Sequence, residues 1–300
     1  MKSGSFHWAT LGVTGALLLC ISGQAGGALI CYDGFDYALG HISAKGAAAD
    51  GWAGAWETFD MEGVQGVDDF PRVVAPGLTY TDDSGESLLV TGNGLQPGYV
   101  RYGNAIRAID LAPGSNAELA DVIDPVTGTI GKDGTTLWLS FLADGPSSGY
   151  ADHWVGMSLY NGSNAQGTEE LFLGKPSGEE HWGVMEIGGP KLLSDVPGSE
   201  QVFYAVRIDF KSGPEDLYLW LNPDLLDEPQ AADAQVRHTL AELRFDRLRV
   251  AGSSLFAIDE LRVGTSYQDV APVPEPSSLC VFGALLPAFL ALPCVRRRKR

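Results

Sequence analysis

Two neighbouring segments in the second half of the chain alternate apolar and polar side chains with a period of two. The apolar positions are Val202, Tyr204, Val206, Ile208 and Phe210 in the first segment and Leu217, Leu219 and Leu221 in the second. Successive side chains of a β-strand point to opposite faces of a sheet, so this period predicts two strands that each bury one face. The connection from Lys211 to Asp216 is compatible with an antiparallel hairpin in which the two apolar faces coincide.

Other segments of the chain have the same character. Residues 137–141 and 155–159 also alternate, and turn-forming Gly, Pro, Asn and Asp separate the segments. The one helical candidate, Ala231–Leu243, is either a short helix or a loop that runs into a strand. Many short strands of this kind predict an all-β fold made of two antiparallel sheets. We expect its core to contain Leu139, Phe141, Val206, Ile208, Leu219 and Leu221.

The two closing segments, 243–250 and 256–263, break the regular alternation. Phe245 and Leu248 are three positions apart, and so are Ile258 and Leu261. Residues at an odd spacing face opposite sides of a regular strand. We therefore expect a β-bulge in each segment, because one extra residue re-aims the side chains that follow it.

The first 28 residues have the three regions of a secretory signal peptide. A basic start at Lys2 is followed by the apolar run Trp8–Ile21 and by small residues up to Ala28. We expect this segment to be removed, with cleavage after Ala25 or Ala28. The mature chain is then predicted to hold one domain, residues 29–270.

A short apolar run lies near the end of the chain. Residues 279–295 are 17 in number, at the lower limit of the roughly 17 to 25 that span a membrane as a helix. Pro287 and Pro293 weaken that helix further. A basic cluster follows, and such a cluster stays on the cytoplasmic side. It consists of Arg296, Arg297, Arg298, Lys299 and Arg300. Two interpretations fit: a permanent anchor, or a sorting signal that is removed after export.

The order of parts in this tail resembles a known sorting signal. Pro274, Glu275 and Pro276 precede two serines, the apolar run and the basic cluster, with 271–278 as motif and linker. This order resembles the PEP-CTERM signal of bacterial exported proteins. The resemblance implies a membrane-embedded exosortase as a partner, transient residence in the membrane through the C-terminal helix, and delivery to the cell surface or an extracellular polysaccharide matrix.

Charge and cysteine content narrow the class of protein further. The chain has 20 basic and 38 acidic residues, and residues 29–271 alone hold 14 and 37, a net charge of −23. Such a surface repels nucleic acid, so we expect no nucleic-acid partner. Cys31 is the only cysteine of the predicted domain, so the domain must be stable without disulfides.

Three short motifs give the domain a family resemblance. They are Tyr32-Asp33-Gly34-Phe35-Asp36-Tyr37, Gly51-Trp52-Ala53-Gly54-Ala55-Trp56 and Ile258-Asp259-Glu260-Leu261-Arg262-Val263-Gly264-Thr265-Ser266-Tyr267. They resemble concanavalin A-like jelly-roll domains of the laminin-G and legume-lectin kind. This resemblance implies a two-sheet jelly-roll sandwich whose first and last strands pair.

Carboxylates at one position raise the question of glycoside hydrolysis. Jelly-roll hydrolases of the laminarinase type carry alternate acids along one strand, and the nearest match here is Glu57, Asp60 and Glu62. Glu57 and Asp60 are three apart, so a regular strand would point them to opposite faces. We therefore favour a solvated acidic loop and no catalytic residues. A divergent endo-glycosidase that uses these acids is the alternative.

The sequence gives little indication of a metal site. The four histidines after the leader stand alone in the sequence, and three pairs of acids lack a complete ligand loop. The histidines are His41, His153, His181 and His238, and the pairs are Asp33 with Asp36, Asp68 with Asp69, and Asp82 with Asp83. We predict no metal and no cofactor, with calcium at one of the acidic pairs as the alternative.

Three aromatic residues are candidates for sugar binding. Trp138, Tyr218 and Trp220 fall on the strand faces opposite the leucines. The apolar face of a sugar stacks on aromatic rings, and a loop that covers the same face would instead make these rings part of the packing. The overall prediction is an exported, non-catalytic protein of the cell surface or matrix that is structural or binds carbohydrate.

Overall fold

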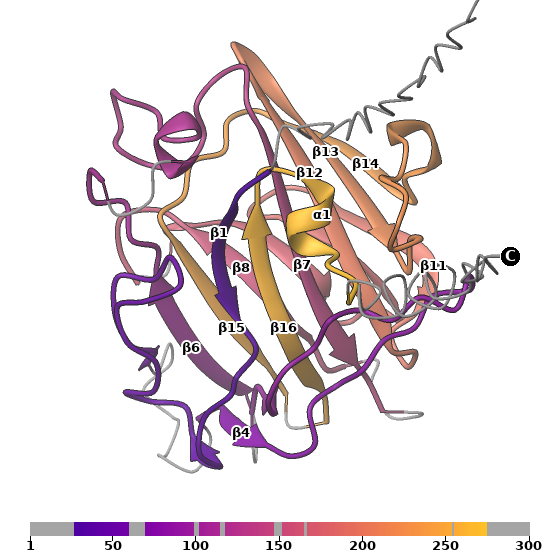
Figure 1. The fold of residues 1–300 in the computed structure, drawn as a ribbon. Coiled ribbons are helices and arrows are strands. Elements are labelled where there is room, and N and C mark those ends of the chain that lie inside the picture. The colour runs from indigo at the N-terminus through magenta and orange to yellow at the C-terminus, as the bar shows by residue number, and fades with distance from the viewer. Residues whose placement is uncertain are drawn as a thin grey trace, which may run out of the picture.

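The computed structural model describes residues 27–59, 70–98, 102–114, 118–146, 152–164, 167–253 and 255–274. The predicted signal peptide up to residue 26, Asp60, Glu62 and the tail from Glu275 lie outside them. The described part of the chain folds into two antiparallel sheets that stack face to face, as Figure 1 shows. No helix within these residues is long and apolar enough to span a membrane.

The first sheet has nine strands and contains the predicted hairpin. In spatial order they are β14 (Val236–Leu240), β13 (Gly213–Leu221), β12 (Val202–Lys211), β7 (Thr136–Asp144), β16 (Ala257–Gly264), β5 (Gly94–Gln96), β4 (Arg72–Val74) and β2 (Gly40–His41), while β1 (Leu29–Asp33) also pairs with β16. The first and last long strands of the domain are therefore neighbours, with Leu29 opposite Gly264. This confirms the pairing that the jelly-roll resemblance implied.

The second sheet has seven strands. Their order is β11 (Lys191–Pro197), β10 (His181–Glu186), β9 (Glu169–Lys175), β8 (Val155–Tyr160), β15 (Arg247–Ser253), β6 (Tyr102–Ala108) and β3 (Glu57–Thr58). Short helices account for little of the described chain, at η2 (Glu118–Asp121), η3 (Ala231–Asp233) and α1 (Tyr267–Val270). The predicted antiparallel two-sheet jelly-roll sandwich is confirmed.

The main core lies between the sheets. All six predicted core side chains, Leu139, Phe141, Val206, Ile208, Leu219 and Leu221, are buried there. The hairpin of β12 and β13 has the predicted antiparallel pairing, with Val206 opposite Leu219. Its turn is tighter than expected, because Lys211 already pairs with Gly213 after a β-bulge. Gly213 adopts φ 142°, a conformation that favours glycine at this turn.

The closing segments differ from the sequence-based expectation. β15 belongs to the second sheet and β16 to the first, so the chain crosses between the sheets after Ser253. The bulge in β16 is confirmed between Asp259 and Arg262. β15 pairs without a register shift, because Phe245 lies before the strand in an isolated bridge to Ile130. The helical candidate resolves into the loop alternative, since η3 is only one turn long and leads into β14.

A second apolar cluster covers the outer face of the first sheet. Side chains of β7, β12 and β13 pack there against α1, which lies across β7 and β16 in Figure 1. The buried members include Trp138, Leu142, Phe203, Trp220, Tyr267 and Val270. Because α1 and the loops cover this face, the described part of the first sheet is buried on both sides at β7, β12 and the end of β13.

A buried ion pair explains two of the family-like motifs. Asp33 and Arg107 are 2.5 Å apart, and their side chains are 2% and 3% exposed. The same carboxylate accepts hydrogen bonds from Trp56 Nε1 (2.7 Å) and the Tyr37 hydroxyl (2.8 Å), while Oδ1 accepts one from the Phe35 amide. Arg107 also donates to backbone carbonyls, and its guanidinium lies 4.8 Å from the Trp52 ring. These motifs therefore hold the segment before β3 against β6.

Candidate functional site

The outer face of the first sheet carries a row of cationic and aromatic side chains. In the register of the sheet, Trp138 on β7 lies opposite Arg207 on β12. Arg207 lies opposite Tyr218 on β13, and Tyr218 lies opposite Arg237 on β14. Residues that face each other directly across strands have Cβ atoms about 5 Å apart, so the four side chains form one line across the sheet.

A second row runs beside the first and is acidic and hydroxylic. Asp209 lies opposite Thr136 on one side and Asp216 on the other, and Asp216 lies opposite Thr239. Thr136 donates a hydrogen bond of 2.9 Å to Asp209. The two rows place hydroxyl, carboxylate and guanidinium groups within one strand spacing of the Tyr218 ring.

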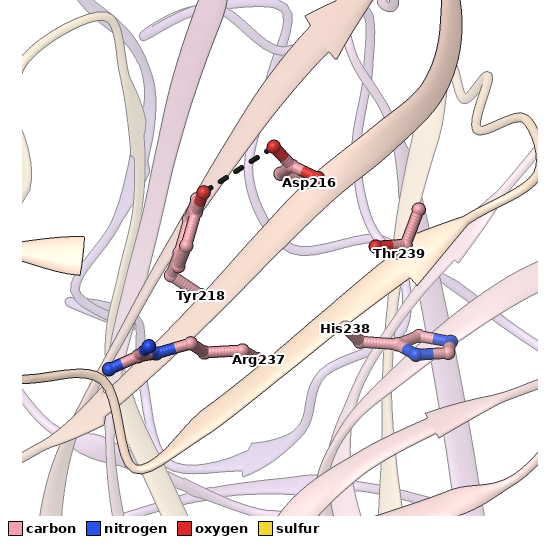
Figure 2. A pocket seen from close by; sticks show the side chains of 5 residues that line it. All are labelled: Asp216, Tyr218, Arg237, His238 and Thr239. Carbon is pink, nitrogen blue, oxygen red and sulfur yellow. Dashed lines mark hydrogen bonds between the residues drawn. The ribbon is translucent and has the colours of Figure 1, made fainter. Parts of the chain in front are cut away.

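At the open end of these rows lies a hollow that we call the Tyr218 groove. It has a volume of about 440 Å³ and is lined by Asp216, Tyr218, Arg237, His238 and Thr239. Figure 2 shows Asp216 and Tyr218 on one strand and the other three residues on its neighbour. A hydrogen bond of 3.4 Å joins the Tyr218 hydroxyl to Asp216, as the dashed line shows.

His238 points away from the other lining residues in Figure 2. It shares the parity of the buried residues Val236 and Leu240, so its ring turns toward the interior of the sandwich. There its Nε2 lies 2.8 Å from Oε2 of Glu186 at the end of β10. This contact joins the two sheets at the edge beside the groove. His238 therefore supports the position of β14.

Aromatic stacking fixes the Tyr218 ring. Its centroid is 6.0 Å from that of Trp220, and the two rings are inclined by 26°. The Arg207 guanidinium also lies 4.8 Å from the Tyr218 ring centroid, a cation–π contact. Trp220 in turn stacks on Trp138 at 5.4 Å. Tyr218 is thus the partly exposed end of a rigid aromatic stack.

The structure separates the three predicted sugar-binding aromatics. Trp138 and Trp220 are only 2% and 3% exposed, whereas Tyr218 is partly exposed. Trp220 borders a neighbouring hollow of about 420 Å³ beneath the loop 223–235, and its indole N–H donates to the Gln230 carbonyl (3.2 Å). The two indoles therefore belong to the packing of the outer cluster, which is the second of the two alternatives stated for them, and Tyr218 remains the candidate for sugar binding.

Ion pairs neutralise most charges around the groove. Arg207 contacts Asp209 at 2.9 Å, and Lys211 contacts Asp216 at 2.7 Å. The hydrogen bond from Lys211 to Asp216 raises the pKa of the Lys211 ammonium above its usual value. Asp216 is therefore compensated, and its oxygens can still accept hydrogen bonds from ligand hydroxyls.

The acidic segment that we expected to be a solvated loop begins in a strand of the second sheet, because Glu57 and Thr58 form β3. Glu57 is an exposed residue of β3 opposite Ile106, and its carboxylate accepts a hydrogen bond of 3.0 Å from Asn164. Asn164 also accepts one from Arg247 (2.8 Å). The pKa of Arg247 is raised, first by its hydrogen bond to Asp246 and also by the charge of Glu57.

These residues line a second hollow that we call the Glu57 cleft. It has a volume of about 170 Å³ and is bordered by small or apolar residues besides the polar ones. The full lining is Ala53, Gly54, Ala55, Glu57, Ile106, Ala108, Asn164 and Arg247. Asp60 and Glu62, the other two acids of this segment, lie outside the described residues.

Two of the remaining acidic candidates, Asp33 and Asp82, have structural partners. Asp33 is held by Arg107, and Asp82 accepts hydrogen bonds from Ser84, the Glu86 amide and the Leu225 amide. Among the residues that the structure describes, no group of three or more His, Cys, Asp and Glu could hold a metal ion. The pair Asp68 and Asp69 lies outside this part of the chain, so calcium there stays a prediction.

Arg207, Asp216, Arg237 and Thr239 were not singled out from the sequence. Arg207 and Asp209 could be assigned to the outer face of their strand by parity alone. The line of four side chains depends on β14, however, whose pairing with β13 is not readable from the sequence because η3 and a loop separate the two strands.

No family model matches the chain. No curated protein matches it either. Several solved structures are similar in fold. The endo-1,3-beta-glucanase from Streptomyces sioyaensis is 12% identical, with a TM-score of 0.42 and alignment over 80% of this chain and 97% of the glucanase.

Two further solved structures are also similar to this chain in fold. An alginate lyase from Polysaccharide Lyase family 7 is 9% identical, with a TM-score of 0.35 over 69% of this chain and 92% of the lyase. The Trypanosoma rangeli sialidase is 9% identical, with a TM-score of 0.36 over 69% of this chain, but this covers only 32% of the sialidase. At these identities the likeness extends to the fold alone.

The comparison corrects one sequence-based expectation. We expected a protein that is not an enzyme, because no catalytic motif could be read. The solved structures similar to this chain are named as a glucanase, a lyase and a sialidase, all carbohydrate-processing enzymes. The lack of a readable motif therefore does not place this chain outside the enzymes, and the exclusion was wrong.

Proposed function

We propose that this domain binds carbohydrate at the Tyr218 groove. The observation that carries the proposal is the Tyr218 ring itself, which is partly exposed, contacts Trp220 and Arg207, and borders the hollow. A fixed aromatic face suits the apolar C–H face of a sugar ring, and it costs little conformational entropy on binding. Asp216 and Thr239 border the same hollow and supply hydrogen-bond partners for sugar hydroxyls.

Replacing Tyr218 by alanine tests this proposal. We expect glycan affinity to fall by about tenfold, which is about 1.4 kcal/mol, because the stacking surface is lost. Tyr218→Phe keeps the ring and is the matched control, with affinity within about threefold of the wild type. Binding would first be found on a glycan array and then measured by titration calorimetry. Equal affinities for the wild type and Tyr218→Ala would place the binding surface elsewhere.

A second candidate function is glycoside hydrolysis at the Glu57 cleft. The observation that favours it is the exposed Glu57 carboxylate in a hollow with Asn164 and Arg247, where small residues leave room for a sugar. A carboxyl group at such a position acts as a general acid, base or nucleophile in glycosidases. The partner carboxylate would be Asp60 or Glu62 of the same sequence segment.

The test of this second candidate is the release of reducing ends from a β-glucan. If Glu57 is catalytic, Glu57→Gln should lower the rate by at least about 100-fold, the scale of losing a general acid or base. Glu179→Gln is the matched control, because Glu179 is a carboxylate at a distant edge, paired with Lys191. A wild-type rate in Glu57→Gln, or no release by the wild type, would remove this candidate.

We also propose that the protein is exported and that an exosortase removes its tail. The PEP-CTERM resemblance motivates this, and the arrangement at the end of the domain supports it. Leu89 donates a hydrogen bond of 2.8 Å to the Pro272 carbonyl, Val273 packs on the outer cluster, and Pro274 is exposed. The motif therefore begins at an exposed residue directly after Val273, which packs on the domain. Intact mass of the surface protein is the measurement, and retention of Arg296–Arg300 would support the permanent anchor instead.

A further inference from the structure

We propose that the Tyr218 groove selects acidic saccharides, with the carboxylate of a uronic acid residue bound by Arg237. This inference rests on the proposed function and adds the chemical class of the ligand. The observation behind it is the row Arg207, Tyr218, Arg237, in which the aromatic ring lies directly between two arginines on adjacent strands. Among the residues that the structure describes, one of these two guanidinium groups has an acidic partner and the other has none.

Arg207 is already compensated. Its guanidinium contacts Asp209 at 2.9 Å and Glu228 at 3.7 Å, and it also lies over the rings of Tyr218 and Trp138. These contacts hold it against the sheet. Arg207 therefore orients the tyrosine, and its charge is largely balanced by the two carboxylates.

Arg237 differs from the other arginines. Six of them form ion pairs, namely Arg107, Arg207, Arg244, Arg247, Arg249 and Arg262. Within the described ranges Arg237 has no carboxylate partner, and its guanidinium donates to the Ala232 carbonyl. The side chain is exposed on β14 and lines the groove. Four of its five N–H donors remain for a ligand.

An uncompensated arginine is a strong local feature in a domain of net charge −23. Guanidinium and carboxylate match in a planar, two-bond geometry, which lysine does not offer. The charge of the rest of the domain is screened beyond about 8 Å at physiological ionic strength, so the nearest charges decide which ligand binds. The nearest acid in the groove, Asp216, is paired with Lys211 at 2.7 Å.

The positions of these side chains also predict the orientation of the ligand. A sugar ring on Tyr218 would have Arg237 on the β14 side and the hydroxyl and carboxylate of Thr239 and Asp216 along the neighbouring row. A carboxylate at C5 of a uronic acid would then pair with Arg237, while ring hydroxyls donate to Asp216. A neutral sugar that stacks on Tyr218 would offer no carboxylate to Arg237.

The experiment compares one saccharide with and without its charge. The full chain would be titrated with an oligogalacturonate and with the methyl ester of the same oligosaccharide. We expect the wild type to bind the acid at least about tenfold more tightly than the ester. Arg237→Gln should remove this preference while the ester binds within about twofold of its wild-type affinity. Arg237→Lys should keep part of the preference, because it keeps the charge but not the two-bond geometry.

Two controls make the outcomes distinct. Lys191→Gln removes an exposed cation on β11 of the other sheet and should change neither affinity. It controls for the loss of one positive charge in Arg237→Gln. Tyr218→Ala should weaken both ligands alike. Equal binding of acid and ester by the wild type, or a preference that survives Arg237→Gln, overturns the inference and leaves the proposed function standing. Binding of neither probe overturns the inference alone, because the glycan array still tests the proposed function. Binding that Tyr218→Ala does not change overturns both.

Discussion

Replacing Asp33 by alanine is expected to lower the free energy of unfolding by about 3–5 kcal/mol. The substitution leaves the Arg107 guanidinium buried without its counter-charge, 3% exposed and 2.5 Å from where the carboxylate was. It also removes the acceptor for Trp56 Nε1 and for the Tyr37 hydroxyl. A buried donor without an acceptor costs about 1–3 kcal/mol, so the loss exceeds that of an ordinary ion pair.

Urea unfolding followed by tryptophan fluorescence measures this effect. Asp36→Ala is the matched control, because Asp36 belongs to the same motif and is exposed. It should change stability by less than about 0.5 kcal/mol. Equal, small losses for the two variants would mean that Arg107 finds other partners, and the explanation of the motif as a structural device would be wrong.

The strand pairs near one another in the sequence could be predicted from the sequence. The apolar period of β12 and β13 set their shared face, and Val206 opposite Leu219 follows once the turn is placed. The turn itself was predicted too long, because the bulge after Asp209 lets Lys211 pair with Gly213. Local alternation thus determines which face of a strand is buried, while a single bulge changes the register.

Partners distant in the sequence could not be predicted in the same way. Segments 243–250 and 256–263 look alike and adjacent, yet they enter different sheets, because each pairs with strands from the first half of the domain. Hydrophobic alternation shows which face of a strand is buried, but it does not show which other strand is its neighbour in the sheet. The pairing of β1 with β16 came from the jelly-roll resemblance alone, and the structure confirms it.

The candidate site, like the fold, could be predicted only where it depends on local sequence. Parity assigned Tyr218 and Trp220 to the outer face, and it assigned Arg207 there as well. What covers that face depends on α1, on residues 78–90 and on the loop 223–235, which pack over Trp138 and Trp220 but leave Tyr218 partly open. Whether an outward aromatic is a binding surface or part of a core is decided by these distant segments.

The acidic residues illustrate a related limit. Asp33, Asp259 and Glu260 stand in the family-like motifs, and the structure buries all three. Glu260 adopts φ 55° in the bulge of β16, accepts hydrogen bonds from Tyr32 and the Thr91 amide, and pairs with Arg262. In the sequence, a buried structural acid cannot be distinguished from a catalytic acid. Only burial and partners distinguish them.

Replacing Trp220 by alanine is the second change with a large expected effect. On the sequence alone, this variant should weaken glycan binding and leave the fold intact. The structure reverses that expectation, since the indole is 3% exposed and stacks on Trp138 at 5.4 Å. Removing a buried tryptophan leaves a cavity and costs about 3–5 kcal/mol. We therefore expect Trp220→Ala to lower the free energy of unfolding by this amount.

Tyr218→Ala is the matched control for this prediction, because it removes an aromatic ring from the same face of the same strand. Tyr218 is partly exposed, so its loss should cost less than about 1.5 kcal/mol of stability while reducing glycan affinity about tenfold. The two variants thus separate packing from binding. Urea unfolding of both proteins and glycan titration at a temperature where both are folded give the comparison. A stable Trp220→Ala protein with reduced affinity would restore the indole to the binding surface and contradict its assignment to the outer cluster.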